Sequence, residues 1–361
     1  MIMVNTGSDS MKIDCDIHPG VPGVEALLPY MSDFWREQFV NREIDGMEIA
    51  SYPPTAPISC RPDWREKGRP PGSSLETVRR QALDGLGLSL AICNPLYGGQ
   101  VAMSEHMGTA VSAAVNDWIR HEWLDREPRL RASIVVAAQD PIAAAEEIDR
   151  CASSDRRFVQ VLMLVANELT LGRRYYWPIF EAAQRHGLPI GIHAGSMQRY
   201  PATPTGSPTH LLQDYASAPQ MFCAQVQSLL CEGVFSKFPD LTFVLIESGV
   251  GWVVPFMWRS TKTWRGVRGE VPWMKRPAID EVRDRIRMTI QPFDGPDAGP
   301  DLERFIEQLG SDDILLFSSD YPHWHFEGSD AMPPGLSSEL ARKIAWQNPL
   351  NTYPRLRESL S

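Results

Sequence analysis

Short runs of apolar residues recur along the whole chain, and a stretch with the composition of a helix follows each run. The runs are residues 12–18, 90–95, 131–138, 158–163, 189–193, 241–246, 286–290 and 314–318. Continuous apolar runs are typical of strands buried on both faces, as in a parallel sheet, whereas half-exposed strands alternate apolar and polar residues. The pattern therefore predicts eight parallel strands that alternate with helices.

The segments between these strands are predicted to form helices and two long proline-rich loops. Helices are expected at residues 24–38, 74–86, 104–125, 141–153, 176–186, 218–235, from 251 onward, 302–309 and 337–346. Prolines crowd residues 40–75 and 195–214, and proline excludes regular helix because it lacks an N–H donor. Loops of this length in a compact protein are usually lids or interaction arms. The Trp-rich segment 258–273 is interpreted as core or as a dimer surface.

Eight strand–helix units in a chain of 361 residues indicate an α/β fold, a single (β/α)8 TIM barrel, rather than an open doubly wound sheet. No Gly-x-Gly-x-x-Gly motif follows the first strand, which argues against a dinucleotide-binding fold. We expect residues 1–11 to form a flexible tail and residues 12–361 to form the barrel, with an insertion at about 40–75. The proline-rich loops are expected at the C-terminal face of the barrel, where active sites of this fold lie.

Composition narrows the range of functions. The net charge of −10 makes nucleic acid an unlikely partner, and no apolar run is long enough to span a membrane. The first ten residues lack the basic and then apolar layout of a signal peptide. The six cysteines show no Cys-x-x-Cys spacing, which fits reduced thiols in a cytoplasmic protein. We therefore expect a cytoplasmic enzyme with a small-molecule substrate.

Histidines and carboxylates stand where several predicted strands end. Asp16 and His18 are two residues apart and so point to the same side of the first strand. Asp14, two residues before Asp16, points to that side as well. His193 ends the fifth strand, and Asp320 follows the eighth. Because a barrel closes its eighth strand beside its first, these side chains are expected to converge at the barrel mouth. Such a set of nitrogen and oxygen donors suits zinc, manganese or iron.

These strand-end motifs resemble the amidohydrolase-related family, a branch of the amidohydrolase superfamily whose members are metal-dependent (β/α)8 barrels. The branch includes aminocarboxymuconate-semialdehyde decarboxylase, resorcylate-type decarboxylases and related hydratases and hydrolases. The matching segments are Ile13–His18, Gly191–Gly195, Leu241–Trp252, Phe317–His323 and Asn348. The resemblance implies that Asp16, His18, His193 and Asp320 are metal ligands and that Asp320 relays a proton to or from metal-bound water.

The chain departs from this family at one position. Decarboxylases of the branch usually carry a Gly-His pair after the sixth strand, but this chain has Ile246-Glu247. Two roles fit Glu247, a general base or an additional metal ligand, and with Asp14 and His323 nearby a second ion is conceivable. We expect Asp320, Glu247 and His323 to be the catalytic residues.

Three classes of function follow from this reading. The first is a metal-dependent hydrolase or non-oxidative decarboxylase that acts on a small organic acid, aromatic or amide compound through metal-activated water. Zinc is the expected ion, with manganese or iron as alternatives. The second is a dinuclear iron or manganese oxygenase, or a subunit of one, resembling 2-aminoisobutyrate hydroxylase. The third is a non-catalytic partner barrel, which the complete ligand set disfavours.

Residues in the loops are candidates for substrate binding. Aromatic or basic side chains expected on the mouth side are Tyr52, Trp64, Tyr97, Arg174, His210 and His325. The aromatic ones suit an apolar substrate, and an arginine suits a carboxylate, although solvated loop positions fit Arg174 and His210 equally well or better. The family resemblance suggests a homodimer, with a hetero-oligomer containing a homologous chain as the alternative.

Overall fold

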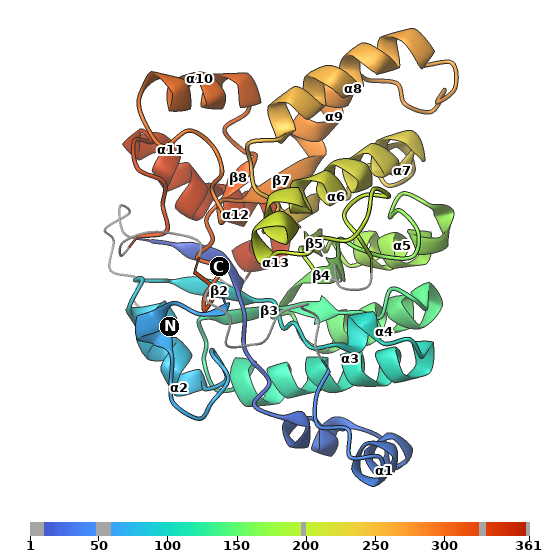
Figure 1. Cartoon of the computed structure of the whole chain (residues 1–361), viewed down its shortest axis with the longest axis vertical. Coiled ribbons are helices and arrows are strands. Elements are labelled where there is room, and N and C mark those ends of the chain that lie inside the picture. Colours follow the sequence, from blue (N-terminus) through green and yellow to red (C-terminus); the bar gives the residue numbers. More distant parts are fainter. Residues whose placement is uncertain (1–10, 48–58, 196–199, 325–329, 359–361) are drawn as a thin grey trace.

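A computed structural model describes residues 11–47, 59–195, 200–324 and 330–358. Within these residues, parallel strands form one sheet in the order of the chain (Figure 1). The strands are β1 (Ile13–Ile17), β2 (Leu90–Cys93), β3 (Leu130–Val135), β4 (Phe158–Leu164), β5 (Ile190–His193), β6 (Phe243–Ile246), β7 (Ile286–Thr289) and β8 (Leu315–Leu316).

Hydrogen bonds between the first and last strands close the sheet into a barrel. The Cys15 N–H donates to the Phe317 carbonyl at 2.9 Å, and the His18 N–H donates to the Tyr321 carbonyl at 2.7 Å. A parallel bridge between Ile17 and Tyr321 lies between them. The strand residues are buried on both sides, as their continuous apolar runs predict. The predicted (β/α)8 barrel is confirmed.

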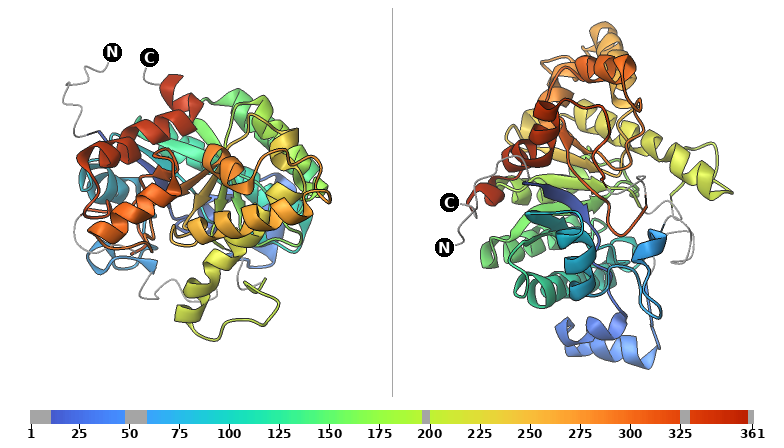
Figure 2. Two further views of the ribbon diagram at one scale, coloured as in Figure 1. Left: turned by 90° about the horizontal axis from the view of Figure 1, so that it is seen from above. Right: turned by 90° about the vertical axis from the view of Figure 1, so that its left-hand side faces the viewer.

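Helices surround the barrel and cover its outer face (Figure 2). The α-helices are α1 (Asp33–Asn41), α2 (Leu75–Val78), α3 (Glu105–Ile119), α4 (Pro141–Ser154), α5 (Trp177–Arg185), α6 (Leu211–Cys231), α7 (Val234–Lys237), α8 (Val253–Val267), α9 (Ala278–Arg285), α10 (Pro300–Leu309), α11 (Ser338–Arg342), α12 (Asn348–Thr352) and α13 (Pro354–Glu358). None of the described helices is long and apolar enough to cross a membrane.

Several helices differ from the prediction. The segment predicted as one helix at 24–38 forms two short 3-10 turns and then α1, because Pro29 lies in the second turn and Ser32 caps α1. Helix α6 begins at Leu211, well before the prediction, and contains Pro219 in its interior. Helix α9 was missed because the basic linker before it carries no helical periodicity.

Candidate metal centre

The strand-end residues singled out by the sequence meet at the C-terminal mouth of the barrel. Asp16 and His18 come from the end of β1, and His193 is the last residue of β5. The register pairs His193 with Ile246, so Glu247 follows directly beside it, and Asp320 follows β8. Asp16, His18, His193 and Asp320 are all nearly or fully buried. Burial of this many ionisable groups at one point is costly unless they bind one another or a cation.

Two of these carboxylates sit on unusual backbone. Glu247 has a φ of 56° and Asp320 a φ of 57°, in the left-handed region that non-glycine residues rarely adopt. Such a conformation costs about 1–3 kcal/mol and persists only where the surroundings hold it. Here the Glu247 N–H donates to the Thr289 hydroxyl at 3.1 Å, and the Asp320 N–H donates to the Asp16 carbonyl at 3.1 Å. Both carboxylates are thereby fixed where the chain leaves its strand.

The donor atoms form one compact group around His18. Its Nε2 lies 3.0 Å from Asp320 Oδ1, 3.2 Å from Asp16 Oδ1 and 3.4 Å from Glu247 Oε1. The Nε2 of His193 lies 3.2 Å from Glu247 Oε1. Four ligands at about 2.1 Å from a tetrahedral ion are about 3.4 Å apart, so these separations suit donors that share one ion.

His323 adds a further nitrogen to the group. Its Nδ1 lies 2.8 Å from Asp320 Oδ1 and 3.4 Å from Glu247 Oε1. The donor atoms therefore form two overlapping sets, each within 4.8 Å: Asp16, His18, His193 and Glu247, and His18, Glu247, Asp320 and His323. The sequence placed His323 near the mouth, and the structure brings it into contact with Asp320.

Backbone carbonyls orient both buried imidazoles. His18 Nδ1 lies 2.9 Å from the Asn94 carbonyl, and His193 Nδ1 lies 2.5 Å from the Ala194 carbonyl. A carbonyl oxygen only accepts, so each Nδ1 carries a proton, and Nε2 is the nitrogen that faces the centre of the group. This is the arrangement in which a metal-ligating histidine is normally held.

The charges in the group shift the pKa values of its members. Burial alone lowers the pKa of His18, but Asp16, Asp320 and Glu247 outweigh burial and raise it well above its ordinary value. Burial alone raises the pKa of Glu247, but the three histidines around it bring that pKa well below the ordinary value. The pKa of the neighbouring Asp14 is raised by burial to about 7. The carboxylates and imidazoles of the site thus stabilise one another's charged forms when no ion is bound.

Unsatisfied atoms test whether an ion fits here. Among the described residues, Asp16 Oδ2 has no hydrogen-bond partner, and His193 Nε2 and Glu247 Oε1 face each other without hydrogen-bond geometry. Buried polar atoms are normally paired, so atoms left unpaired at one point indicate a missing partner. A divalent ion held by Asp16, His18, His193 and Glu247 would satisfy all three atoms, so this donor set fits a metal, and Asp320, in the second set around His18, is the fifth proposed ligand.

The candidate substrate-binding residues are scattered. Trp64 is buried and packs on Tyr321, next to the ligand Asp320, with ring centroids 4.9 Å apart. Tyr97 is largely buried, and burial raises its pKa to about 12. Arg174 stacks on Trp177, and His210 is exposed just before α6.

Trp64 and Tyr97 were expected in loops that pack on the substrate, but the structure buries both. Among the described residues, neither Arg174 nor His210 pairs with the metal-binding group. Tyr52 and His325 lie outside the described residues.

The structure shows one site residue that the sequence reasoning missed. This residue is Asn94, at the end of β2. Its side chain donates to Asp16 Oδ1 at 2.8 Å, and its backbone carbonyl accepts from His18 Nδ1. The sequence feature that could have identified Asn94 is its position directly after a predicted strand and before Pro95.

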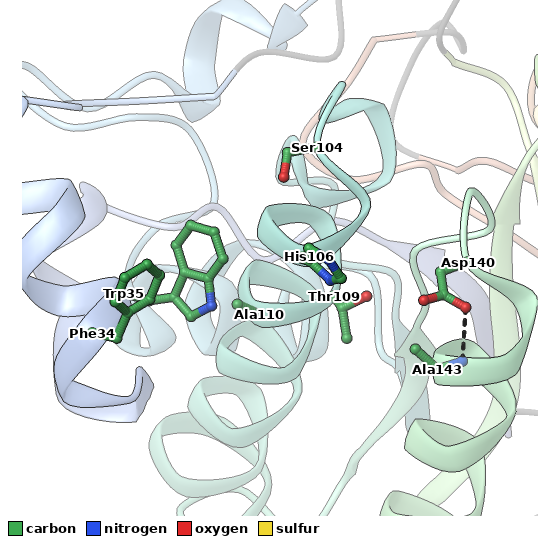
Figure 3. A pocket seen from close by; sticks show the side chains of 8 residues that line it. All are labelled: Phe34, Trp35, Ser104, His106, Thr109, Ala110, Asp140 and Ala143. Atoms are coloured by element: carbon green, nitrogen blue, oxygen red, sulfur yellow. Dashed lines mark hydrogen bonds between the residues drawn. The ribbon is translucent and has the colours of Figure 1, made fainter.

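A separate cavity of about 530 Å³ lies between α1 and the N-terminal ends of α3 and α4 (Figure 3). It is lined by Phe34, Trp35, Ser104, His106, Thr109, Ala110, Asp140 and Ala143. The cavity shares no residue with the group of donor atoms, so the chemistry of the barrel mouth does not extend into it.

Fold and site together define a metal-dependent (β/α)8 barrel enzyme. The family model for amidohydrolases matches residues 13–355, and the chain belongs to that family. The gamma-resorcylate decarboxylase of a Polaromonas species is 26% identical over 260 residues, which cover 66% of this chain and 74% of that protein. The family resemblance and the predicted enzyme class, a metal-dependent hydrolase or non-oxidative decarboxylase, are therefore confirmed.

Solved structures share the fold. An amidohydrolase of Mycobacterium avium subsp. paratuberculosis matches with a TM-score of 0.70 at 20% identity, covering 94% of this chain and 98% of that one. A dihydroxybenzoic acid decarboxylase of Polaromonas, with bound manganese and the inhibitor 2-nitroresorcinol, matches with a TM-score of 0.66 at 20% identity, covering 97% and 99%. None of the relatives named here is an oxygenase, so the oxygenase alternative gains no support.

Metal affinity is expected to depend on pH through His323. Burial alone lowers its pKa, but Asp320 and Glu247 raise it to about 9. Below pH 9 the metal-free protein therefore holds a proton on His323 that a bound cation would repel. Binding should release this proton, so affinity should rise with pH up to about 9. His323→Gln should reduce the slope of log affinity against pH by about one between pH 7 and 9. Manganese titrations followed by electron paramagnetic resonance measure both slopes, and equal slopes would contradict the prediction.

Proposed function

We propose that this protein is a metal-dependent, non-oxidative decarboxylase of a hydroxylated aromatic acid. The observation that carries the proposal is the pair of overlapping donor sets at the barrel mouth, which share His18 and Glu247. Support for the substrate class comes from the relatives, among them gamma-resorcylate decarboxylases and the dihydroxybenzoic acid decarboxylase.

We propose manganese as the resident ion, in place of the zinc expected from the sequence. Three of the five proposed ligands are carboxylates, and oxygen-rich donor sets suit manganese, whereas zinc favours nitrogen and sulfur. The related Polaromonas decarboxylase holds manganese. A divalent ion at this position supplies a Lewis acid that polarises the oxygens of a bound hydroxybenzoate.

The chain's own residues handle the proton. Decarboxylation adds one proton to the ring carbon that bears the carboxylate; the bond to the carboxylate carbon then breaks, its electron pair returns to the ring, and CO2 leaves. His323 can pass a proton from solvent to Asp320, because its side chain is partly exposed whereas that of Asp320 is fully buried. Nδ1 lies 2.8 Å from Asp320 Oδ1, within the distance needed for proton transfer. Asp320 then delivers the proton to the substrate.

Three further expectations stay proposals. We propose a cytoplasmic homodimer, with a hetero-oligomer containing a homologous chain as the alternative. The support is the family resemblance and, for the compartment, cysteines that are all unpaired and mostly buried. Residues Trp64 and Tyr97 are proposed to border the substrate from loops on the mouth side, although both are largely buried in this conformation.

The proposed reaction is testable with a panel of substrates. Purified protein loaded with manganese is expected to release CO2 from 2,6-dihydroxybenzoate or a related hydroxybenzoate, and to leave unsubstituted benzoate unchanged. Metal analysis should give one ion per chain. Amide and ester analogues form the matched control for hydrolysis. Hydrolysis of these analogues without any CO2 release would refute decarboxylation, and two ions per chain would point to a dinuclear centre.

A further inference from the structure

Asn94 contacts two of the proposed metal ligands at once. Its Nδ2 donates to Asp16 Oδ1 at 2.8 Å and to the Cys15 carbonyl at 3.3 Å. Its backbone carbonyl accepts the proton of His18 Nδ1 at 2.9 Å, and its N–H donates to the Ile17 carbonyl at 2.8 Å. The residue is fully buried, so no solvent molecule from the surface competes for these contacts.

A buried polar chain continues from Asn94 across two more strands. Ser133 of β3 donates its hydroxyl to Asn94 Oδ1 at 2.6 Å. Gln160 of β4 donates Nε2 to Ser133 Oγ at 2.8 Å and to Asn94 Oδ1 at 3.3 Å. The hydroxyl of Tyr353, between α12 and α13, donates to Gln160 Oε1 at 3.1 Å. All of these side chains are fully buried.

The donors and acceptors of this chain allow one orientation of the Asn94 amide. A carboxylate only accepts, so the group facing Asp16 is the NH2 of Asn94 and the group facing away is its oxygen. That oxygen needs donors, which Ser133 and Gln160 supply. Gln160 can do so because Gly191 of β5 leaves room: a Cβ on Gly191 would stand 2.6 Å from Gln160 Cδ.

We propose that Asn94 is the positioning residue that sets the geometry of Asp16 and His18, and that Ser133 and Gln160 fix Asn94 in turn. The inference rests on the proposed assignment of Asp16 and His18 as ligands. Through one residue, the end of β2 restrains a carboxylate oxygen and holds the Nδ1 proton of His18, so that Nε2 is the nitrogen left to face a metal. Groups that orient metal ligands in this way typically change metal affinity by about 10–100-fold when they are lost.

The test measures manganese binding directly, by electron paramagnetic resonance, on three single variants. Asn94→Ala is expected to weaken binding by about 10–100-fold and to broaden the signal of the bound ion, because Asp16 loses its restraint. Gln160→Leu, which touches neither proposed ligand, should weaken binding by a smaller factor. Asn116→Ala is the matched control: Asn116 is also fully buried and makes three hydrogen bonds, but to Val135 and Glu147. It should bind manganese as the wild type does, within about twofold.

The outcomes separate this inference from the proposed function. If Asn94→Ala and Gln160→Leu both bind manganese like the wild type, the positioning role is refuted while the metal site stands. If Asn94→Ala does not fold, as judged by thermal unfolding in the presence of a chelator, Gln160→Leu decides alone, and unchanged binding refutes the role. If Asn116→Ala loses affinity equally, the effect is a general loss of packing and the role is refuted. Failure of the wild type to bind any divalent ion refutes the metal site itself, and binding without decarboxylation refutes only the proposed reaction.

Discussion

His193→Ala is expected to abolish catalysis and to weaken metal binding more than any variant of the residues around the ligands. The Nε2 of His193 is a buried atom that can bind a metal, and it has no hydrogen-bond partner among the described residues. It faces the group of carboxylates. Loss of a ligand removes the Lewis acid, which contributes several kcal/mol, so activity should fall by at least about 1000-fold. Metal analysis after dialysis and the rate of CO2 release measure the two effects.

His186→Ala is the matched control for this variant. The two histidines flank the same strand: His186 precedes β5 and pairs with Asp149 at 2.7 Å, whereas His193 ends β5 at the mouth. His186→Ala should therefore keep its metal content and its activity. Equal loss in both variants would show that damage to β5, and not loss of a ligand, causes the effect. Full metal content in His193→Ala would contradict the proposed site.

Glu247→Gln should show the second largest effect. Glu247 contacts His18, His193 and His323 within 3.4 Å, and its pKa lies well below the ordinary value, so it is ionised at neutral pH. Glutamine keeps the shape and removes the charge that holds a cation. We expect manganese affinity to fall by at least about 100-fold and the rate of CO2 release by about 100-fold or more. A manganese titration gives the dissociation constant, which reports on binding. The value of kcat, measured at saturating manganese, reports on the chemistry.

Glu247→His tests whether another residue that can bind a metal or accept a proton replaces Glu247. Histidine is the residue that decarboxylases of this branch usually carry after the sixth strand, and it tolerates the left-handed backbone of this position better than most residues. The histidine variant is expected to keep decarboxylation within about tenfold of the wild type, which the glutamine variant should not. Wild-type affinity and rate in Glu247→Gln would show that Glu247 is neither a ligand nor a base.

The sequence by itself determined the barrel and most of the candidate metal site. Most strands are continuous apolar runs, and burial on both faces follows from such a run. Alternation along β1 put Asp16 and His18 on one side, and the topology of a closed barrel put Asp320 beside them. These features depend on the chain's local pattern and on a fold whose strands close in order, so no long-range detail was needed.

Other features depended on how separate segments pack. Ser32 caps the start of α1, and Trp64 is buried because it packs on Tyr321. Tyr97 was likewise expected to face the substrate but is largely buried. An aromatic residue in a loop has the same local sequence whether it faces a substrate or the core, because only its distant neighbours differ.

The tertiary structure alone decided how the donor atoms are held. The link from Asn94 to Asp16 and His18 joins residues far apart in the chain, and the left-handed backbone of Glu247 and Asp320 is held by hydrogen bonds to Thr289 and Asp16. Hydrogen bonds act over about 3 Å and require a given angle, so they depend on the final position of each strand end. The sequence therefore predicted which atoms would be present at the mouth, and the packing of the closed barrel fixed their orientation.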